Sequence, residues 1–425
     1  MTTTETDSRR LRLGTRGSRL ALTQSGQVAE ALIASGGGGA AAAAGKASEG
    51  SGGLSIDLVT VRTDGDGDRT PLRQLGGVGV FAARLRHALL DGEVDLVVHS
   101  FKDLPTQPVE GLEVICVPPR EDPRDALCAR DGLTLADLPE GARVGTGSPR
   151  RAAQLLAARP DLEVVDLRGN VPTRLARVRG LETVGVGTDE PVAPSRADAA
   201  GDLDAVVLAL SGLRRLGLEH CASEVLDLET MLPAPAQGAL AVEARADEDS
   251  AELARAAAAL DDEPTRLAVT AERALMTRLG AGCAAPVGAW AYLRDDSQEP
   301  REEHAEHGTG WNEGFRGDDT AETRPSQGAG TGQDAGPVVP RGSAVSRRSP
   351  RVLVLRAVVT SLDGGQEVGC ELSTELPEAS GGPGAPGDTA AVRAAEALGV
   401  RAAEVLLDDG ADQIVDLHAN KPRRH

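Results

Sequence analysis

Two stretches, Leu13-Gly14-Thr15-Arg16-Gly17-Ser18-Arg19 and Val144-Gly145-Thr146-Gly147-Ser148-Pro149-Arg150-Arg151, repeat one order of residue types. Each runs from a strand-like apolar residue through Gly-Thr, Gly-Ser and arginine into a segment with helical spacing. We interpret them as strand–turn–helix units of two similar α/β domains that face each other. A helix N-terminus with a hydroxyl and an arginine is an anion site. The residues leave one alternative open, that Ser18 and Ser148 only cap their helices.

Strand-like and helix-like segments alternate around these two stretches. Strand patterns fall at 54–61, 94–98, 163–167 and 205–209, and helical patterns fall at 18–34, 80–90, 148–158 and 172–178. This alternation predicts mostly parallel sheets. Near the C-terminus, strands at 351–360 and 367–372, joined by a turn at 363–365, predict a hairpin followed by a helix that begins at Asp388 or Thr389 and ends near Gly410.

Composition excludes several classes of protein. Hydrophobic residues make up 40% of the 425 residues, which allows two or three domains with sizeable cores. Aromatic residues make up only 1%, so platforms for base stacking are nearly absent. The net charge of −20 repels nucleic-acid phosphates and anionic membranes. With no CxxC pair, metal-ligand spacing, signal peptide or long apolar run, we expect a cytoplasmic protein without metal.

Three tracts of low complexity interrupt the pattern, at 36–53, 185–202 and 295–350. They are rich in Gly, Ala, Pro and polar residues, so they cannot bury enough apolar surface to offset the entropy of ordering. We expect them to be disordered or loop-like insertions without a catalytic role.

A third informative stretch, Val94-Asp95-Leu96-Val97-Val98-His99-Ser100-Phe101-Lys102-Asp103-Leu104-Pro105, places a lysine and a carboxylate just past an apolar strand. Open α/β sheets bind their ligands at such strand ends. Lys102 is one of only three lysines in the chain, which otherwise uses arginine for positive charge. The alternative is a strand cap whose two charges face solvent.

Arginines recur after the expected strands, and several guanidinium groups in one pocket would suit a ligand with several carboxylates. They are Arg16, Arg19, Arg150, Arg151, Arg168, Arg174 and Arg215. Any single one could be an ordinary surface charge. Cys283 lies in the loop-like stretch 279–288, rich in glycine, which would let a ligand approach the sulfur. No cation or base is adjacent to Cys283, so a buried inert cysteine is the alternative.

Taken in order along the chain, these motifs resemble the porphobilinogen deaminase family. The resemblance covers nearly all of the chain outside the three tracts. The stretches that carry it are Thr15–Ser18, Leu75–Phe81, Val98–Pro105, Arg120–Ala126, Val144–Arg151, Leu167–Val171, Pro235–Ala239 and Gly282-Cys283.

The resemblance implies a transferase of tetrapyrrole and haem biosynthesis, hydroxymethylbilane synthase. It implies a dipyrromethane cofactor that is joined to Cys283 by a thioether. Porphobilinogen would lose ammonia, and the free α-carbon of the terminal pyrrole would attack the electrophilic methylene. After four units have been joined head to tail, water would release hydroxymethylbilane.

The resemblance also assigns roles to residues. Asp103 would be the catalytic residue, a buried carboxylate among arginines that stabilises the developing cation and transfers protons. The cofactor would be bound by Cys283, Lys102, Asp103, Ser148, Arg150, Arg151 and Arg168. The substrate would be bound by Arg16, Ser18, Arg174, Arg215 and Gln237.

The predicted fold class is α/β, with two similar doubly wound domains around a cleft, like periplasmic binding proteins, and a small α+β C-terminal domain. We expect the first domain at 1–118 plus about 239–256, the second at 124–232, and the cofactor-anchoring domain at 261–425 with a disordered insert at 295–350. From the composition and charge we expect a protein that binds neither nucleic acid nor membrane. The family precedent implies a monomer, which could pass its product to the next enzyme of the pathway.

Two departures from the family pattern matter. Gln74 and Val78 stand where many relatives carry lysines, so we expect no charged substrate contact from the segment 71–81. The three tracts have no counterpart in compact relatives. A two-lobed anion-binding protein and an inactive regulatory homologue remain alternatives, although neither requires Asp103 or Cys283.

Overall fold

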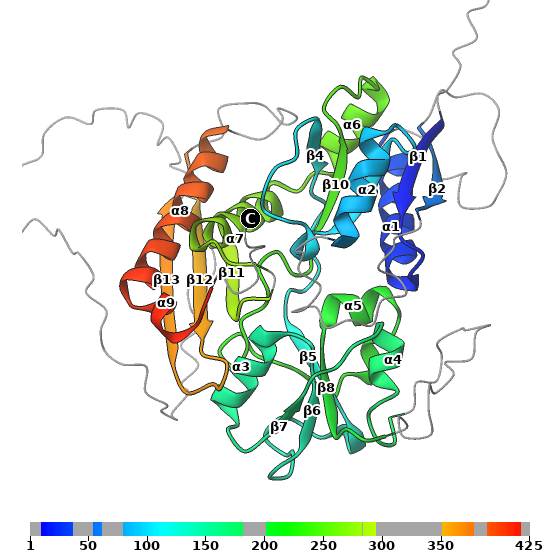
Figure 1. Ribbon diagram of the computed structural model, residues 1–425. Helices are drawn as coiled ribbons and strands as arrows, with labels where there is room; N and C mark the ends of the chain where they lie inside the picture. Colours follow the sequence, from blue (N-terminus) through cyan, green and yellow to red (C-terminus); the bar gives the residue numbers. More distant parts are fainter. Residues whose placement is uncertain are drawn as a thin grey trace, which may run out of the picture. The chain divides into compact units, whose positions relative to one another are not determined.

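The computed structural model describes residues 10–36, 54–61, 80–181, 201–282, 284–294, 351–377 and 389–417, with the elements labelled in Figure 1. Cys283, Gln74, Val78 and nearly all of the three low-complexity tracts lie outside the described residues. The expectations about them therefore stay predictions.

The first sheet is mixed, and its central strands lie next to one another although they are far apart in sequence. Its spatial order is β2 (Ser55–Thr60), β1 (Arg10–Thr15), β3 (Leu96–Ser100), β10 (Leu240–Arg245) and β4 (Leu112–Cys116). Strand β1 pairs in parallel with β2 and β3, whereas β10 runs antiparallel to β3 and β4. The prediction of a mostly parallel sheet is confirmed, with one antiparallel strand that returns from beyond the second sheet.

The second sheet repeats this topology. Its order is β7 (Glu163–Val165), β6 (Arg143–Gly145), β8 (Ala205–Ala209), β5 (Asp125–Ala129) and β9 (Glu224–Val225). Here β6 pairs in parallel with β7 and β8, and β5 is the antiparallel strand in fourth place. The repeat seen in the sequence therefore corresponds to a repeated strand order.

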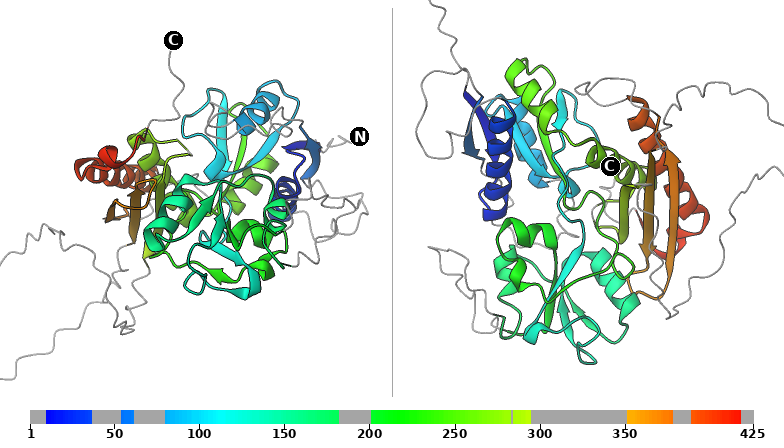
Figure 2. Two further views of the ribbon diagram at one scale, coloured as in Figure 1. Left: turned by 60° about the horizontal axis from the view of Figure 1, so that its bottom comes forward. Right: turned by 180° about the vertical axis from the view of Figure 1, so that it is seen from behind.

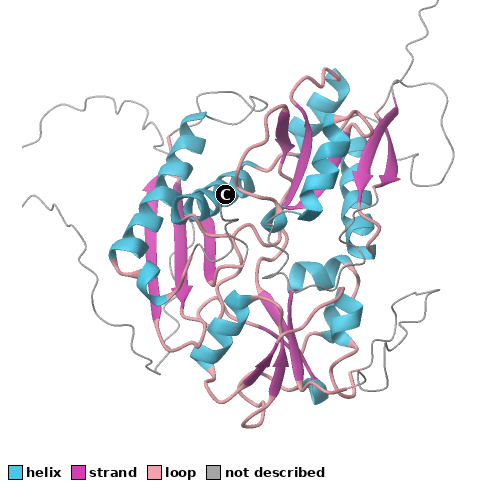
Figure 3. Ribbon diagram, in the orientation of Figure 1, coloured by secondary structure: helices cyan, strands magenta, loops and turns pink. Residues whose placement is uncertain are grey.

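Helices cover both faces of each of these sheets, as the predicted doubly wound architecture requires (Figure 3). One face of the first sheet packs against α1 (Arg19–Ser35) and α6 (Ala251–Leu260), and the other face packs against α2 (Val80–Leu90). On the second, one face packs against α4 (Val171–Leu175) and α5 (Leu210–Arg215), and the other against α3 (Pro149–Ala158).

Ser18 and Ser148, the serines of the two repeated stretches, each cap a helix, as one interpretation of the sequence predicts. Ser18 Oγ accepts a hydrogen bond from the Ala21 amide at 3.3 Å at the start of α1, and Ser148 Oγ accepts one from the Arg151 amide at 3.5 Å at the start of α3. A capping serine still presents a helix N-terminus. The caps therefore do not test the predicted contacts of Ser18 and Ser148 with ligands, and these contacts stay predictions.

The C-terminal region forms a separate antiparallel sheet with two long helices against one face (Figure 2). The sheet consists of β11 (Val287–Arg294), β12 (Val352–Thr360) and β13 (Glu367–Glu375), and it packs against α7 (Glu263–Leu279) and α8 (Thr389–Asp408), which is followed by α9 (Ala411–Ile414). The predicted hairpin and long helix are confirmed. None of the described helices is long and apolar enough to span a bilayer.

The strand directions gather the predicted site residues at one edge of each of the first two sheets. Strands β1 and β3 end at the same edge, and β10 begins there because Leu240 pairs with Ser100. In the second sheet, β6 and β8 end where β5 begins, since Asp125 pairs with Ala209. Such carboxyl-terminal edges are where α/β proteins bind ligands.

Candidate active site

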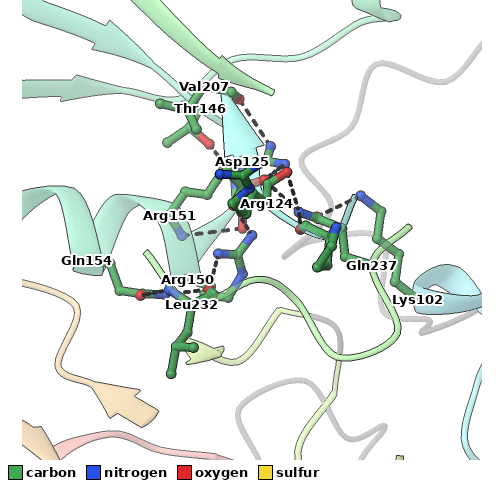
Figure 4. Close-up of polar contacts among 12 residues, drawn as sticks. Lys102, Arg124, Asp125, Thr146, Arg150, Arg151, Gln154, Val207, Leu232 and Gln237 are labelled. Atoms are coloured by element: carbon green, nitrogen blue, oxygen red, sulfur yellow. Dashed lines mark hydrogen bonds and ion pairs between the residues drawn. The ribbon is translucent and has the colours of Figure 1, made fainter. Parts of the chain in front are cut away.

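Asp125, the first residue of β5, lies at the centre of the polar contacts in Figure 4 and is fully buried, at 0% exposure. Its Oδ2 accepts a hydrogen bond from Arg150 Nη2 at 2.7 Å, and its Oδ1 accepts one from Arg151 Nη2 at 2.7 Å. Burial acts to raise the pKa of Asp125, but the guanidinium groups of Arg150 and Arg151 hold it well below its usual range. Asp125 is therefore an ionised carboxylate inside the protein.

Arg150 and Arg151 are also buried, at 3% and 5% exposure. Their other terminal nitrogens donate to backbone carbonyls, Arg150 Nη1 to Leu232 at 2.6 Å and Arg151 Nη1 to Val207 at 3.1 Å. In the described part of the chain, the Nε of each is buried without a hydrogen-bond partner. The protein thus holds each arginine in place, and the buried Nε–H of each can still donate a hydrogen bond to an anionic ligand.

Gln237 connects this cluster to the first sheet. Its Nε2 donates to Asp125 Oδ1 at 2.7 Å and to the Pro123 carbonyl at 2.7 Å, and its Oε1 accepts from Lys102 Nζ at 3.2 Å. We call Lys102, Asp125, Arg150, Arg151 and Gln237 the Asp125 cluster. It joins residues from both ligand edges.

An unusual turn presents Gln237. Ala236 has φ 62° and Gly238 has φ 89°, both in the left-handed region. A Cβ at Gly238 would lie 2.3 Å from the carbonyl oxygen of Glu121, so only glycine fits there. The turn brings the segment before β10 against the segment before β5.

Lys102 and Asp103 lie on the 3₁₀ turn η3 (Phe101–Asp103) that follows β3. Lys102 is half-buried, and burial together with Arg151 and Arg150 lowers its pKa to about 8, against the opposing effect of Asp103 and Asp125. Asp103 is exposed. The expectation that Asp103 is a buried carboxylate among arginines was therefore wrong, because η3 projects past the strand end. Asp125 occupies that environment instead.

Helix α7 of the C-terminal region holds the η3 turn in place. Arg273 donates from Nη1 to the Leu104 carbonyl and from Nη2 to the Pro105 carbonyl, each at 2.8 Å. Its guanidinium carbon lies 4.5 Å from the centroid of the Phe101 ring, a cation–π contact. The segment that carries Lys102 and Asp103 is thus fixed from a third part of the protein.

Arg174 belongs to the same electrostatic environment. Its Nε donates to the Gly169 carbonyl at 2.8 Å. Burial, Arg151 and Arg168 lower the pKa of Arg174 to about 10, while Asp103 and Asp166 act to raise it. The exposed Asp103 of the first sheet therefore acts on an arginine of the second.

The remaining predicted residues lie at the same two edges. Arg215 donates from Nη2 to the Gly238 carbonyl at 2.6 Å, and burial lowers its pKa. Arg16 and Arg168 are half-buried. Among the described residues, no hydrogen bond joins Arg16 or Ser18 to the Asp125 cluster. Their contacts with substrate stay predictions.

Sequence reasoning missed a second buried network that supports the first. Glu272 of α7, at 0% exposure, accepts from Arg120 Nη1 at 2.7 Å and Nη2 at 3.1 Å, and also from the amides of Ala236 and Ala291. Arg120 Nε in turn donates to the Gln237 carbonyl at 2.7 Å.

A sequence signal for the missed carboxylates existed. Asp125 opens the apolar run 126–129, and Glu272 lies on the apolar face of a helix. Buried carboxylates at such positions are rare unless they are paired. The sequence could therefore have indicated that each had a cationic partner, but not which one.

The cluster holds more positive than negative groups. Lys102, Arg150 and Arg151 act on the single buried carboxylate of the cluster, Asp125, or lie near it, and Arg174 adds a further cation that acts on Arg151. Desolvated cations of this kind favour a ligand with several carboxylates. No group of metal-binding side chains occurs among the described residues.

Comparisons with known proteins agree with this chemistry. The model of the porphobilinogen deaminase dipyromethane cofactor binding domain matches residues 11–253, and that of the C-terminal domain matches residues 266–298. Porphobilinogen deaminase of Cutibacterium acnes is 46% identical over 97% of this chain and 99% of its own length. That of Micrococcus luteus is 56% identical over 67% of this chain and 74% of its own length.

Among solved structures, a YaeC-family lipoprotein from Enterococcus faecalis is 16% identical, with a TM-score of 0.31 over 60% of this chain and 92% of that one. At that TM-score the likeness carries no weight. The matches to the family models and to the curated relatives decide the matter: the chain belongs to the porphobilinogen deaminase family.

Proposed function

We propose that the protein is a hydroxymethylbilane synthase, which joins four porphobilinogen units head to tail with release of ammonia and then releases hydroxymethylbilane by hydrolysis. The observation that carries this proposal is the Asp125 cluster, where three cations from two sheets, two of them buried, outnumber one buried carboxylate. Each porphobilinogen unit brings two carboxylates, so a growing chain needs such an excess of cations.

The family model for residues 11–253 describes a domain that binds the dipyromethane cofactor. When bound, this cofactor supplies the pyrrole α-carbon on which the product is extended. The unpartnered Nε donors of Arg150 and Arg151 fit its carboxylates. We propose that Cys283 anchors it by a thioether and that its side-chain carboxylates are held by Lys102, Ser148, Arg150, Arg151 and Arg168.

Asp103 is the carboxylate best placed to act on the substrate, because it is exposed at the strand end beside the cluster. Each addition breaks a C–N bond and forms a C–C bond. One proton must reach the leaving amine, and another must leave the attacked carbon. We propose that the Asp103 carboxylate transfers these protons and stabilises positive charge on the pyrrole.

Arg174 is the best-supported substrate contact. It is half-buried, its Nε is held by Gly169, and its two Nη atoms have no hydrogen-bond partner in the part of the chain that the structure describes. A guanidinium fixed at one nitrogen presents the others to a carboxylate. Arg16, Ser18 and Arg215 are proposed as further contacts.

The cytoplasmic location, the monomeric state and the transfer of product to the next enzyme are proposals that rest on the resemblance to the family. The reaction proposed for the site does not depend on any of these three proposals.

The proposed activity is tested by incubating the purified full-length chain with porphobilinogen and measuring ammonia and hydroxymethylbilane. We expect four molecules of ammonia for each bilane. Absence of ammonia release, or ammonia without a linear tetrapyrrole, would contradict the proposal.

A further inference from the structure

Gln237 separates two charged side chains of opposite sign. It is fully buried, at 0% exposure, and lies between Lys102 Nζ, 3.2 Å from its Oε1, and Asp125 Oδ1, 2.7 Å from its Nε2. The Pro123 carbonyl accepts a second hydrogen bond from Nε2. Both ends of the amide are therefore engaged within the protein (Figure 4).

The hydrogen bonds allow only one orientation of this amide. A flipped amide would place its NH₂ group against the Lys102 ammonium and its oxygen against the Asp125 carboxylate. Each contact would then join two donors or two acceptors. Arg120 holds the same residue by its backbone carbonyl, at 2.7 Å, so the side chain is also fixed at its base.

We infer that Gln237 is a positioning residue, a neutral spacer that holds Lys102 at the site while keeping its ammonium group out of an ion pair with Asp125. Lys102 then keeps its charge for ligand carboxylates, and Asp125 keeps its oxygens for Arg150 and Arg151. This positioning role does not depend on the direct substrate contact predicted for Gln237, which stays a prediction. It rests on the proposed function, which gives Lys102 a ligand carboxylate to hold.

The charged groups around Lys102 make the neutrality of the spacer important. Besides burial, Asp103 and Asp125 act to raise the pKa of the Lys102 ammonium, while Arg151 and Arg150 act to lower it. A further charge in direct contact would therefore decide how firmly Lys102 is held and at what pH it titrates.

Two substitutions of similar size separate this role from simple packing. In Gln237→Glu, burial beside Asp125 raises the pKa of the new carboxyl group. While protonated, this group can donate to Asp125 and accept from Lys102, as the amide does. Once ionised, it repels Asp125 and pairs with Lys102. Gln237→Leu removes the acceptor and the donor at every pH.

The first readout is the pH profile of bilane formation by full-length protein. We expect Gln237→Glu to approach wild-type turnover at low pH and to lose about tenfold or more as pH rises through a titration that wild type lacks. We expect Gln237→Leu to be slower by about tenfold or more at every pH, without the new titration. Profiles of wild-type shape in both variants would overturn the inference.

The second readout does not depend on activity. The rate at which acetic anhydride modifies Lys102, followed by peptide mass spectrometry across pH, gives the titration midpoint of this amine. We expect the midpoint to fall in Gln237→Leu, which has lost an acceptor for the ammonium, and to rise in Gln237→Glu. Unchanged midpoints in both variants would overturn the inference even if wild type formed no bilane, an outcome that would separately refute the proposed function.

Gln154 offers a matched control. It is a buried glutamine, at 5% exposure, whose amide exchanges hydrogen bonds with the Leu232 backbone at 2.7 and 3.1 Å and touches neither Lys102 nor Asp125. We expect Gln154→Leu to lower stability and to leave the Lys102 midpoint at its wild-type value. A shift in this control as large as that in Gln237→Leu would assign the effect to general loosening and would contradict the inference.

Discussion

The two sheets share one strand order, yet their ligand edges differ. In the second sheet, Asp125, Arg150 and Arg151 are at most 5% exposed and bind one another. In the first, Lys102 is half-buried and Asp103 is exposed on a short turn. One domain thus supplies a fixed charge cluster, and the other presents more exposed charged groups, including the carboxylate that we propose transfers protons. Substitutions at the two edges should therefore affect different properties.

The largest effect on stability should come from Asp125→Asn. Removing this carboxylate leaves two buried guanidinium groups without their counter-ion, at a cost of about 3–5 kcal/mol. Because the pKa of Asp125 is lowered in the folded protein, this contribution is full above about pH 4 and is lost as pH falls further. Urea unfolding of the full-length chain at pH 7 measures the effect.

Asp57→Asn is the matched control for that prediction. Asp57 pairs with Arg10 at 3.3 Å, and both side chains are more than half exposed. Exposed pairs contribute about 1 kcal/mol or less. Equal losses of unfolding free energy in Asp57→Asn and Asp125→Asn would contradict the claim that the buried carboxylate contributes more to stability than an exposed ion pair does.

The opposite pattern is expected at the first edge. Asp103→Asn should lower turnover about a hundredfold or more, because it removes the proposed proton-transfer group. The free energy of unfolding should change by about 0.5 kcal/mol or less, since Asp103 is exposed. Steady-state turnover and urea unfolding on the same preparation test both parts. A stable variant with wild-type turnover would remove Asp103 from the mechanism.

A smaller effect concerns pH. With its pKa lowered to about 8, Lys102 is a cation below that pH and loses its charge above it, so kcat/KM of wild type should fall above about pH 8. At pH 9 about a tenth of the charged form remains. Lys102→Arg keeps its charge and should lack this alkaline limb, whatever its absolute rate. Parallel declines in both proteins would show that another group titrates.

The two helix caps should have smaller effects on stability than the buried carboxylate of Asp125. Ser18→Ala and Ser148→Ala each remove one hydrogen bond to a helix amide, at 3.3 and 3.5 Å, and each should cost about 1 kcal/mol of unfolding free energy. Thermal or urea unfolding compares the two variants. A cost confined to one serine would show that the repeated stretches are not equivalent in structure.

Local sequence patterns predicted much of the fold. The helices at 80–90 and 148–158 and the strand at 205–209 match α2, α3 and β8 to within a residue. The pattern could not predict that β5 and β10 run antiparallel between parallel strands, because that pairing joins segments far apart in the chain. The strand expected at 94–98 is found at Leu96–Ser100, where its pairing with β10 sets its limits.

The site was predictable in composition but not in geometry. The structure brings together Lys102, Arg150 and Arg151, which were chosen because they follow strands. Which carboxylate would lie between the arginines was decided by the start of β5, 25 residues from Arg150. No local pattern shows that Asp125 rather than Asp103 would be the carboxylate paired with Arg150 and Arg151, so the environment expected for Asp103 is occupied by Asp125.

The most direct test of the central claim, a site that holds a covalently anchored pyrrole pair, is the intact mass of the purified full-length chain beside a Cys283→Ser variant. We predict a mass excess of two linked pyrrole units in wild type that is absent from the variant. A wild-type mass equal to that of the bare chain, both before and after incubation with porphobilinogen, would contradict the claim.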